Sequence, residues 1–107
     1  MNQTSVALTA LFDKIPRRHS IENVKNINTI IVEYETLLKD IEAANAWYEK
    51  NTAVFFEELD TVRSIVKKST DNKASKKNKD NYFDEASGIL KNSIESLIAL
   101  YDNGQKK

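Results

Sequence analysis

The fold of this chain follows from residues 20–68, which read SIENVKNINTIIVEYETLLKDIEAANAWYEKNTAVFFEELDTVRSIVKK. It contains no glycine and no proline, and its apolar side chains recur every seven positions and again three or four positions later. Residues with this spacing lie on one face of an α-helix. We call this set the heptad stripe: Ile27, Ile30, Ile31, Tyr34, Leu37, Leu38, Ile41, Ala44, Tyr48, Phe55, Leu59, Val62, Ile65 and Val66.

The stripe predicts one very long helix over about residues 20–68. At 1.5 Å per residue such a helix is about 73 Å long, which the rest of the chain is too short to cover. The weakest point is Asn51-Thr52, where one helix could end and the next begin. Because the repeat passes this point unchanged, we expect a continuous helix whose stripe is covered in a homodimer. The alternative is a helical hairpin within a monomer.

Shorter helices flank the long one. Four apolar side chains with i, i+3, i+4, i+7 spacing predict an N-terminal helix that ends before Pro16, because helical conformation is disfavoured before proline. Ser20 then has the side chain of an N-cap for the long helix. The four residues are Leu8, Leu11, Phe12 and Ile15.

The C-terminal part of the chain contains a polar segment and a last helix. Residues 69–80 have one alanine as their only apolar side chain, which predicts a mobile basic loop. A helix beginning near Asp80 or Asn81 and ending at Asn103-Gly104 should run antiparallel to the end of the long helix. The sequence therefore predicts a single all-α domain over residues 1–107, a bundle of three to four helices.

The composition excludes several chemistries. The 107 residues include no cysteine, one histidine, His19, and two glycines, Gly88 and Gly104. Thiolate chemistry and glycine-rich phosphate loops are therefore absent, and no catalytic triad can be assembled. We expect no enzyme activity, and no catalytic, cofactor-binding, metal-binding or small-molecule site. With no signal peptide or membrane span in the pattern, we expect a cytoplasmic protein.

Aromatic residues form the first candidate binding site. Trp47, Val54 and Phe56 lie beside the stripe and widen the apolar face, which indicates contact with more than one neighbouring helix. The candidate partner-binding residues are Trp47, Tyr48, Phe55 and Phe56. All four can belong to the core. Trp47 and Phe56 flank the stripe, however, and aromatic residues at the edge of a core are typical anchors for a protein partner.

A basic segment, residues 63–79, forms the second candidate site. It carries seven cationic side chains against Asp71, whereas residues 33–60 carry eight acidic against two basic side chains. Such a segment can bind phosphate groups, but no aromatic residue lies among the lysines to stack on bases. The cationic residues are Arg63, Lys67, Lys68, Lys73, Lys76, Lys77 and Lys79.

These patterns favour a non-catalytic protein–protein interaction module, such as a small helical adaptor, chaperone or inhibitor. We expect it to self-associate as a homodimer through the heptad stripe and to bind a partner protein. The alternative is a small accessory protein that binds nucleic acid through residues 63–79.

Overall fold

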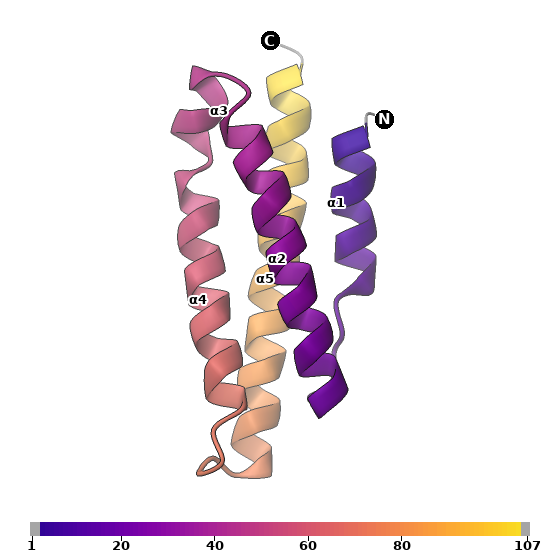
Figure 1. Ribbon diagram of the computed structural model, residues 1–107, viewed down its shortest axis with the longest axis vertical. Helices are drawn as coiled ribbons and strands as arrows, with labels where there is room; N and C mark the ends of the chain where they lie inside the picture. The colour runs from indigo at the N-terminus through magenta and orange to yellow at the C-terminus, as the bar shows by residue number, and fades with distance from the viewer. Residues whose placement is uncertain (1–2, 106–107) are drawn as a thin grey trace.

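The computed structural model describes residues 3–105 and consists of five helices and their connections (Figure 1). α1 (Gln3–Lys14) and α4 (Ala53–Ser69) run in one direction, and α2 (Ile21–Glu42) and α5 (Lys76–Gln105) run in the other. The short α3 (Ala46–Asn51) joins α2 to α4. The predicted all-α bundle is therefore confirmed. It measures 48 × 23 × 17 Å, and the start of α1 and the end of α5 lie near the same end of its long axis.

The predicted continuous helix over residues 20–68 is wrong. The chain reverses at Ala43–Asn45, so that α4 runs antiparallel to α2 (Figure 1). The Asn45 side chain caps α3 by accepting a hydrogen bond from the Tyr48 N–H at 2.9 Å. At the predicted weak point, Asn51-Thr52, α3 ends and α4 begins, but the chain does not reverse there. The Thr52 hydroxyl donates to the Tyr48 carbonyl at 2.8 Å.

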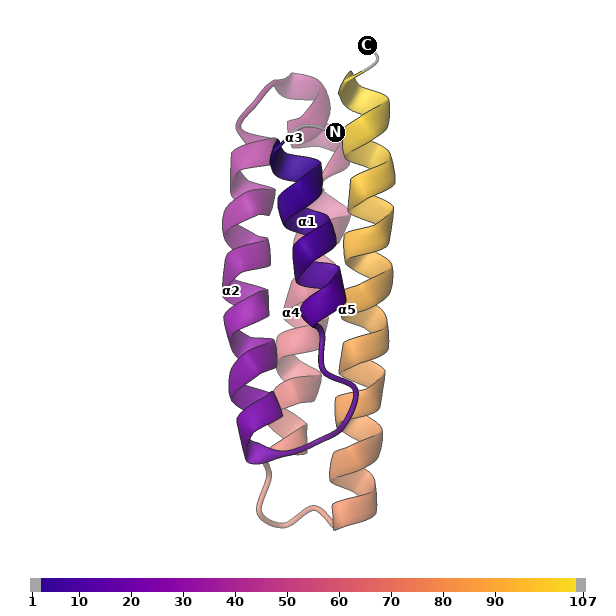
Figure 2. The same cartoon turned by 90° about the vertical axis from the view of Figure 1, so that its right-hand side faces the viewer.

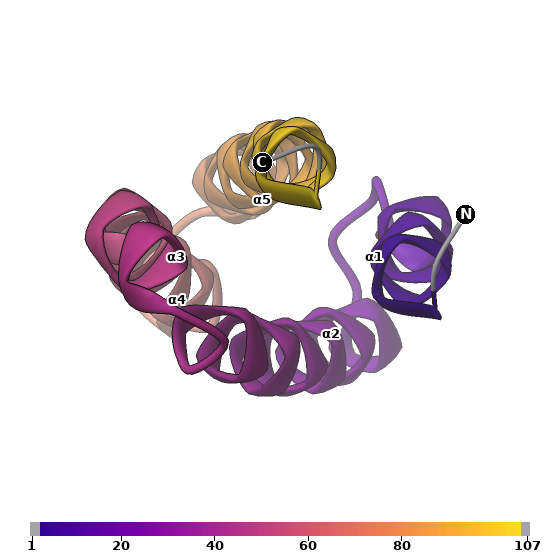
Figure 3. The same ribbon diagram turned by 90° about the horizontal axis from the view of Figure 1, so that it is seen from above.

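The heptad stripe is covered within a single chain. Every member except Leu37 and Ala44 is buried, because α2, α3 and α4 turn the same side towards a common core. α5 packs along α4, and α1 fills the corner between α2 and α5 (Figures 2 and 3). This burial removes the argument that a second molecule must cover the stripe.

Local signals at the first connection are confirmed. α1 ends at Lys14, ahead of Pro16, and the Ser20 hydroxyl caps α2 by accepting from the Asn23 N–H at 3.0 Å. The connection is fixed to the last helix as well, because the buried Ser87 donates to the Pro16 carbonyl at 2.9 Å.

The predicted boundaries of the last helix are wrong, although its antiparallel direction is confirmed. The loop spans only residues 70–75, and Ser75 caps α5 by accepting from the Asn78 N–H at 3.1 Å. Ser69 is buried at the end of α4. At the other end, α5 continues through Gly104 to Gln105. The polar first turns of α5 form a helix because lysine and aspartate are compatible with helix even without an apolar pattern.

Gly104 allows a close approach between α5 and α3. A Cβ atom added at Gly104 would fall on the ring and hydroxyl of Tyr48, whereas one added at Gly88 would meet nothing within 4 Å. The Tyr48 hydroxyl donates to the Tyr101 carbonyl at 2.9 Å and accepts from Gln105 Nε2 at 3.0 Å. Tyr48 is therefore held against the last turn of α5 on the side that lacks a side chain.

Substitution of the two glycines by alanine should change the free energy of unfolding in opposite directions. Gly104→Ala should lower the free energy of unfolding by about 1–3 kcal/mol, because Tyr48 has to move. Gly88→Ala, the matched control, should raise it by about 0.5–1 kcal/mol, because it only removes backbone freedom. Urea denaturation of both variants measures the difference. Equal effects of the two substitutions would contradict the Tyr48 contact.

Candidate binding surfaces

One end of the bundle collects many cationic side chains, and we call it the basic pole. The connections 15–20 and 70–75 meet there, at the starts of α2 and α5 (Figure 2). Arg17, Arg18 and Lys76 line one surface pocket at this end, together with the carboxylates of Asp80 and Asp84. The two arginines were not assigned to the basic segment from the sequence, because only the fold brings residue 17 beside residue 76.

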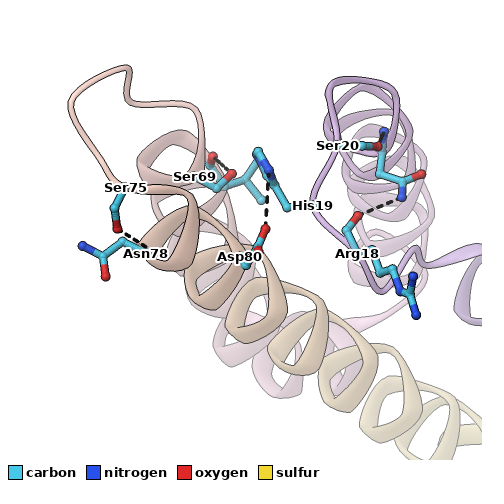
Figure 4. A network of polar contacts seen from close by, with 9 residues as sticks. Arg18, His19, Ser20, Ser69, Ser75, Asn78 and Asp80 are labelled. Atoms are coloured by element: carbon cyan, nitrogen blue, oxygen red, sulfur yellow. Dashed lines mark hydrogen bonds and ion pairs between the residues drawn. The ribbon is translucent and has the colours of Figure 1, made fainter.

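Polar contacts fix the shape of the basic pole (Figure 4). His19 Nδ1 lies 3.9 Å from Asp80 Oδ1, and the imidazole meets the Phe83 ring edge-on at 5.7 Å between centroids. The Arg18 carbonyl accepts from Asn23 Nδ2 at 2.8 Å. His19 thus attaches the first connection to α5, which holds the backbone beside Arg17 and Arg18 in place.

The seven predicted cationic residues are not equivalent. Arg63 lies on the side of α4, where its guanidinium contacts Glu35 at 3.1 Å and Asp60 at 3.6 Å, so its charge is already compensated. The other six lie towards the basic pole, five of them exposed and Lys79 half-buried. They are Lys67, Lys68, Lys73, Lys76, Lys77 and Lys79.

The predicted aromatic partner site is divided between core and surface. Tyr48 and Phe55 are buried, whereas Trp47 and Phe56 are half-buried. The Tyr48 ring stacks on Tyr101 at 5.6 Å and meets Trp47 edge-on at 5.2 Å. Tyr48 and Phe55 are therefore structural residues, and only the outer edges of Trp47 and Phe56 remain available to a partner.

A surface with few charged side chains lies over α1 and α2, and we call it the α1–α2 face. Residues 3–12 and 26–32 contain no charged side chain, although 30% of the chain is charged. Val6 and Val32 are 53% and 59% exposed on these segments. Between the two helices lies an apolar groove of about 410 Å³. Its lining comprises Ala7, Ala10, Leu11, Lys14, Val32, Glu33, Thr36 and Leu37.

A polar pair lies in the interior of the bundle. The hydroxyls of Tyr34 and Ser93 hydrogen-bond at 2.7 Å between α2 and α5, and burial raises the pKa of Tyr34 far above its ordinary value. The nearby Glu58 charge acts in the same direction, and its buried Oε1 has no hydrogen-bond partner among residues 3–105. A tyrosine held neutral in this way is suited to fixing helix register rather than to acting as a base.

Two further arrangements are absent from the described part of the chain. Among residues 3–105, no three histidine or acidic side chains come together so that they could hold a metal ion. Within the same residues, no helix combines the length and the apolar character that a membrane span requires.

Comparison with known proteins gives no relative from which a role could be transferred. No protein-family model, no curated protein and no solved structure matches this chain. The basic pole and the α1–α2 face are therefore the two surfaces whose own chemistry bears on function.

Proposed function

We propose that this protein is a non-catalytic protein–protein interaction module that presents the α1–α2 face to a partner protein. The observation that carries the proposal is the apolar groove between α1 and α2, whose segments 3–12 and 26–32 carry no charged side chain although 30% of the chain is charged. Because the heptad stripe is buried, a partner has to bind an outer surface instead. A cytoplasmic adaptor, chaperone or inhibitor is the class we propose, consistent with a chain that has no cysteine.

The composition of the α1–α2 face supports this proposal. The centres of protein interfaces are depleted of charged residues. The groove on this face has the same character, because Lys14 and Glu33 are the charged residues of its lining and the other lining residues are uncharged. The small side chains of Ala7 and Ala10 leave room beside Val32 for apolar side chains of another helix. Covering the exposed parts of Val6 and Val32 would contribute roughly 1 kcal/mol each. Such a gain suits a reversible interaction.

A photocrosslinking amino acid placed at position 32 tests the proposed face in the cells that produce the protein. We expect a covalent protein adduct from position 32 and little or none from position 64, where the exposed Ser64 lies on α4. Ala10→Glu should abolish the adduct from position 32, because it puts a long charged side chain into the apolar groove.

The control for this experiment is to show that the Ala10→Glu variant is still folded. Ala10 is exposed and glutamate favours helix, so Ala10→Glu should leave the thermal unfolding midpoint nearly unchanged. Equal adduct yields from positions 32 and 64, or an adduct that survives Ala10→Glu in a folded protein, would contradict the proposed face.

A second candidate function is nucleic-acid binding at the basic pole. The observation that favours it is the convergence of Arg17 and Arg18 with Lys76 around one pocket, which adds two guanidinium groups to the lysine-rich segment. Arg63 does not belong to this surface, because it is paired with Glu35. Phosphate contacts of this kind give binding without sequence preference and with strong salt dependence.

A salt titration of binding to duplex DNA tests this candidate. If Arg17 and Arg18 each contact a phosphate, Arg17→Gln with Arg18→Gln should reduce the slope of log K against log salt concentration by about 1.8. Arg63→Gln, which removes a charge already compensated within the chain, should leave the slope unchanged. A slope unaffected by the double substitution would exclude Arg17 and Arg18 as phosphate contacts, and with them the observation that favours this candidate.

A further inference from the structure

We infer that the occupant of the α1–α2 groove is a second copy of this chain, bound about a two-fold axis. The inference rests on the proposed function and names the partner of the same face. It replaces the heptad stripe with a different self-association surface, formed by Val6 and Val32 and by the groove between their helices.

Electrostatics single out this face for contact with its own copy. In a two-fold dimer each surface meets itself, so a surface with charges of one sign repels its partner. The basic pole carries an excess of cations, and residues 33–60 carry eight acidic against two basic side chains. The α1–α2 face carries one lysine and one glutamate at its groove, so it can approach its own copy without net repulsion.

The two charges at the groove are placed for reciprocal pairing. Lys14 on α1 and Glu33 on α2 line the same two surface pockets, and both side chains are exposed. Within the described residues no ion pair joins them to each other or to another side chain. A two-fold axis through the groove would set Lys14 against the partner's Glu33 and Glu33 against the partner's Lys14. Val32 would then enter the partner's groove.

The size of the face sets the strength of the dimer. The twelve residues of α1 extend about 18 Å, and two adjacent helices are about 20 Å wide, which gives roughly 400 Å² per copy. Twice this area lies below the range of about 1,200–2,000 Å² that stable complexes bury. We therefore expect a weak and rapidly reversible dimer.

Sedimentation of the purified protein over a concentration series tests the inference. The wild-type chain, 12.2 kDa as a monomer, should approach twice that mass with rising concentration. Lys14→Glu and Glu33→Lys should each weaken dimerisation roughly tenfold, because each sets two pairs of like charges against one another. The double variant with both reversals should recover the wild-type dimerisation constant within about twofold, since it restores opposite charges.

The controls separate the surface from general charge effects. Lys50→Glu reverses an exposed charge on α3 and should leave dimerisation unchanged. Val32→Glu should weaken it at least about tenfold, because the new carboxylate is buried at the centre of the contact. A monomer at concentrations up to about 1 mM would overturn the inference, as would a dimer insensitive to Val32→Glu or not rescued by the double reversal.

The proposed function and this inference fail in different ways. If the photocrosslink from position 32 joins the chain to a different protein while the purified chain stays monomeric, the second copy is excluded and the interaction face remains. If position 32 gives no specific adduct and the chain stays monomeric, both are excluded.

Discussion

The structure depends on burying an apolar stripe that is longer than any single neighbouring helix. Fully burying one large apolar side chain contributes about 1.5–3 kcal/mol, so leaving even five members of the stripe in water would cost about 8–15 kcal/mol. That equals the entire stability of a typical domain, about 5–15 kcal/mol. The chain meets this requirement by reversing at Ala43–Asn45, so that the stripe on α2 faces its continuation on α3 and α4. The Asn45 cap allows the reversal to be short.

This reversal determines where the two candidate binding surfaces, the basic pole and the α1–α2 face, lie on the bundle. It sends α4 back beside α2, which brings the 70–75 connection and the start of α5 to the end of the bundle that holds Arg17 and Arg18. The basic pole is thus a consequence of the topology. The same arrangement leaves α1 and α2 side by side at one edge, where the chain carries few charges and Val6 and Val32 stay exposed.

Signals that act over a few residues were sufficient to predict the fold class, the end of α1 before Pro16, and the Ser20 cap. The reversal was given only as the alternative, and at Asn51-Thr52 rather than Ala43–Asn45. A seven-residue repeat spans two helical turns and reads the same in one long helix and in two antiparallel arms. Asn45 was the available signal, since asparagine is a preferred N-cap. The start of α5 was placed too late because Lys76 to Asp80 carry no apolar periodicity that marks a helix.

The candidate surfaces were predicted only in part. The division of the aromatic residues followed from the sequence, because Trp47 and Phe56 lie beside the stripe and Tyr48 and Phe55 lie on it. Arg17 and Arg18 could not be joined to Lys76, since residues so far apart in sequence meet only through the tertiary fold. The α1–α2 face was missed, although the absence of charge from residues 3–12 and 26–32 is visible in the sequence.

A distance between the two ends of the hairpin shows whether the heptad stripe folds back on itself within one chain. Spin labels on cysteines introduced at Lys25 and Thr70 suit this purpose, because the native chain has no cysteine and the two residues line one surface pocket. In labelled protein diluted with unlabelled protein, the hairpin predicts a distance comparable with the 23 Å width of the bundle. A distance of about 68 Å, the length of 45 residues of uninterrupted helix, would contradict it.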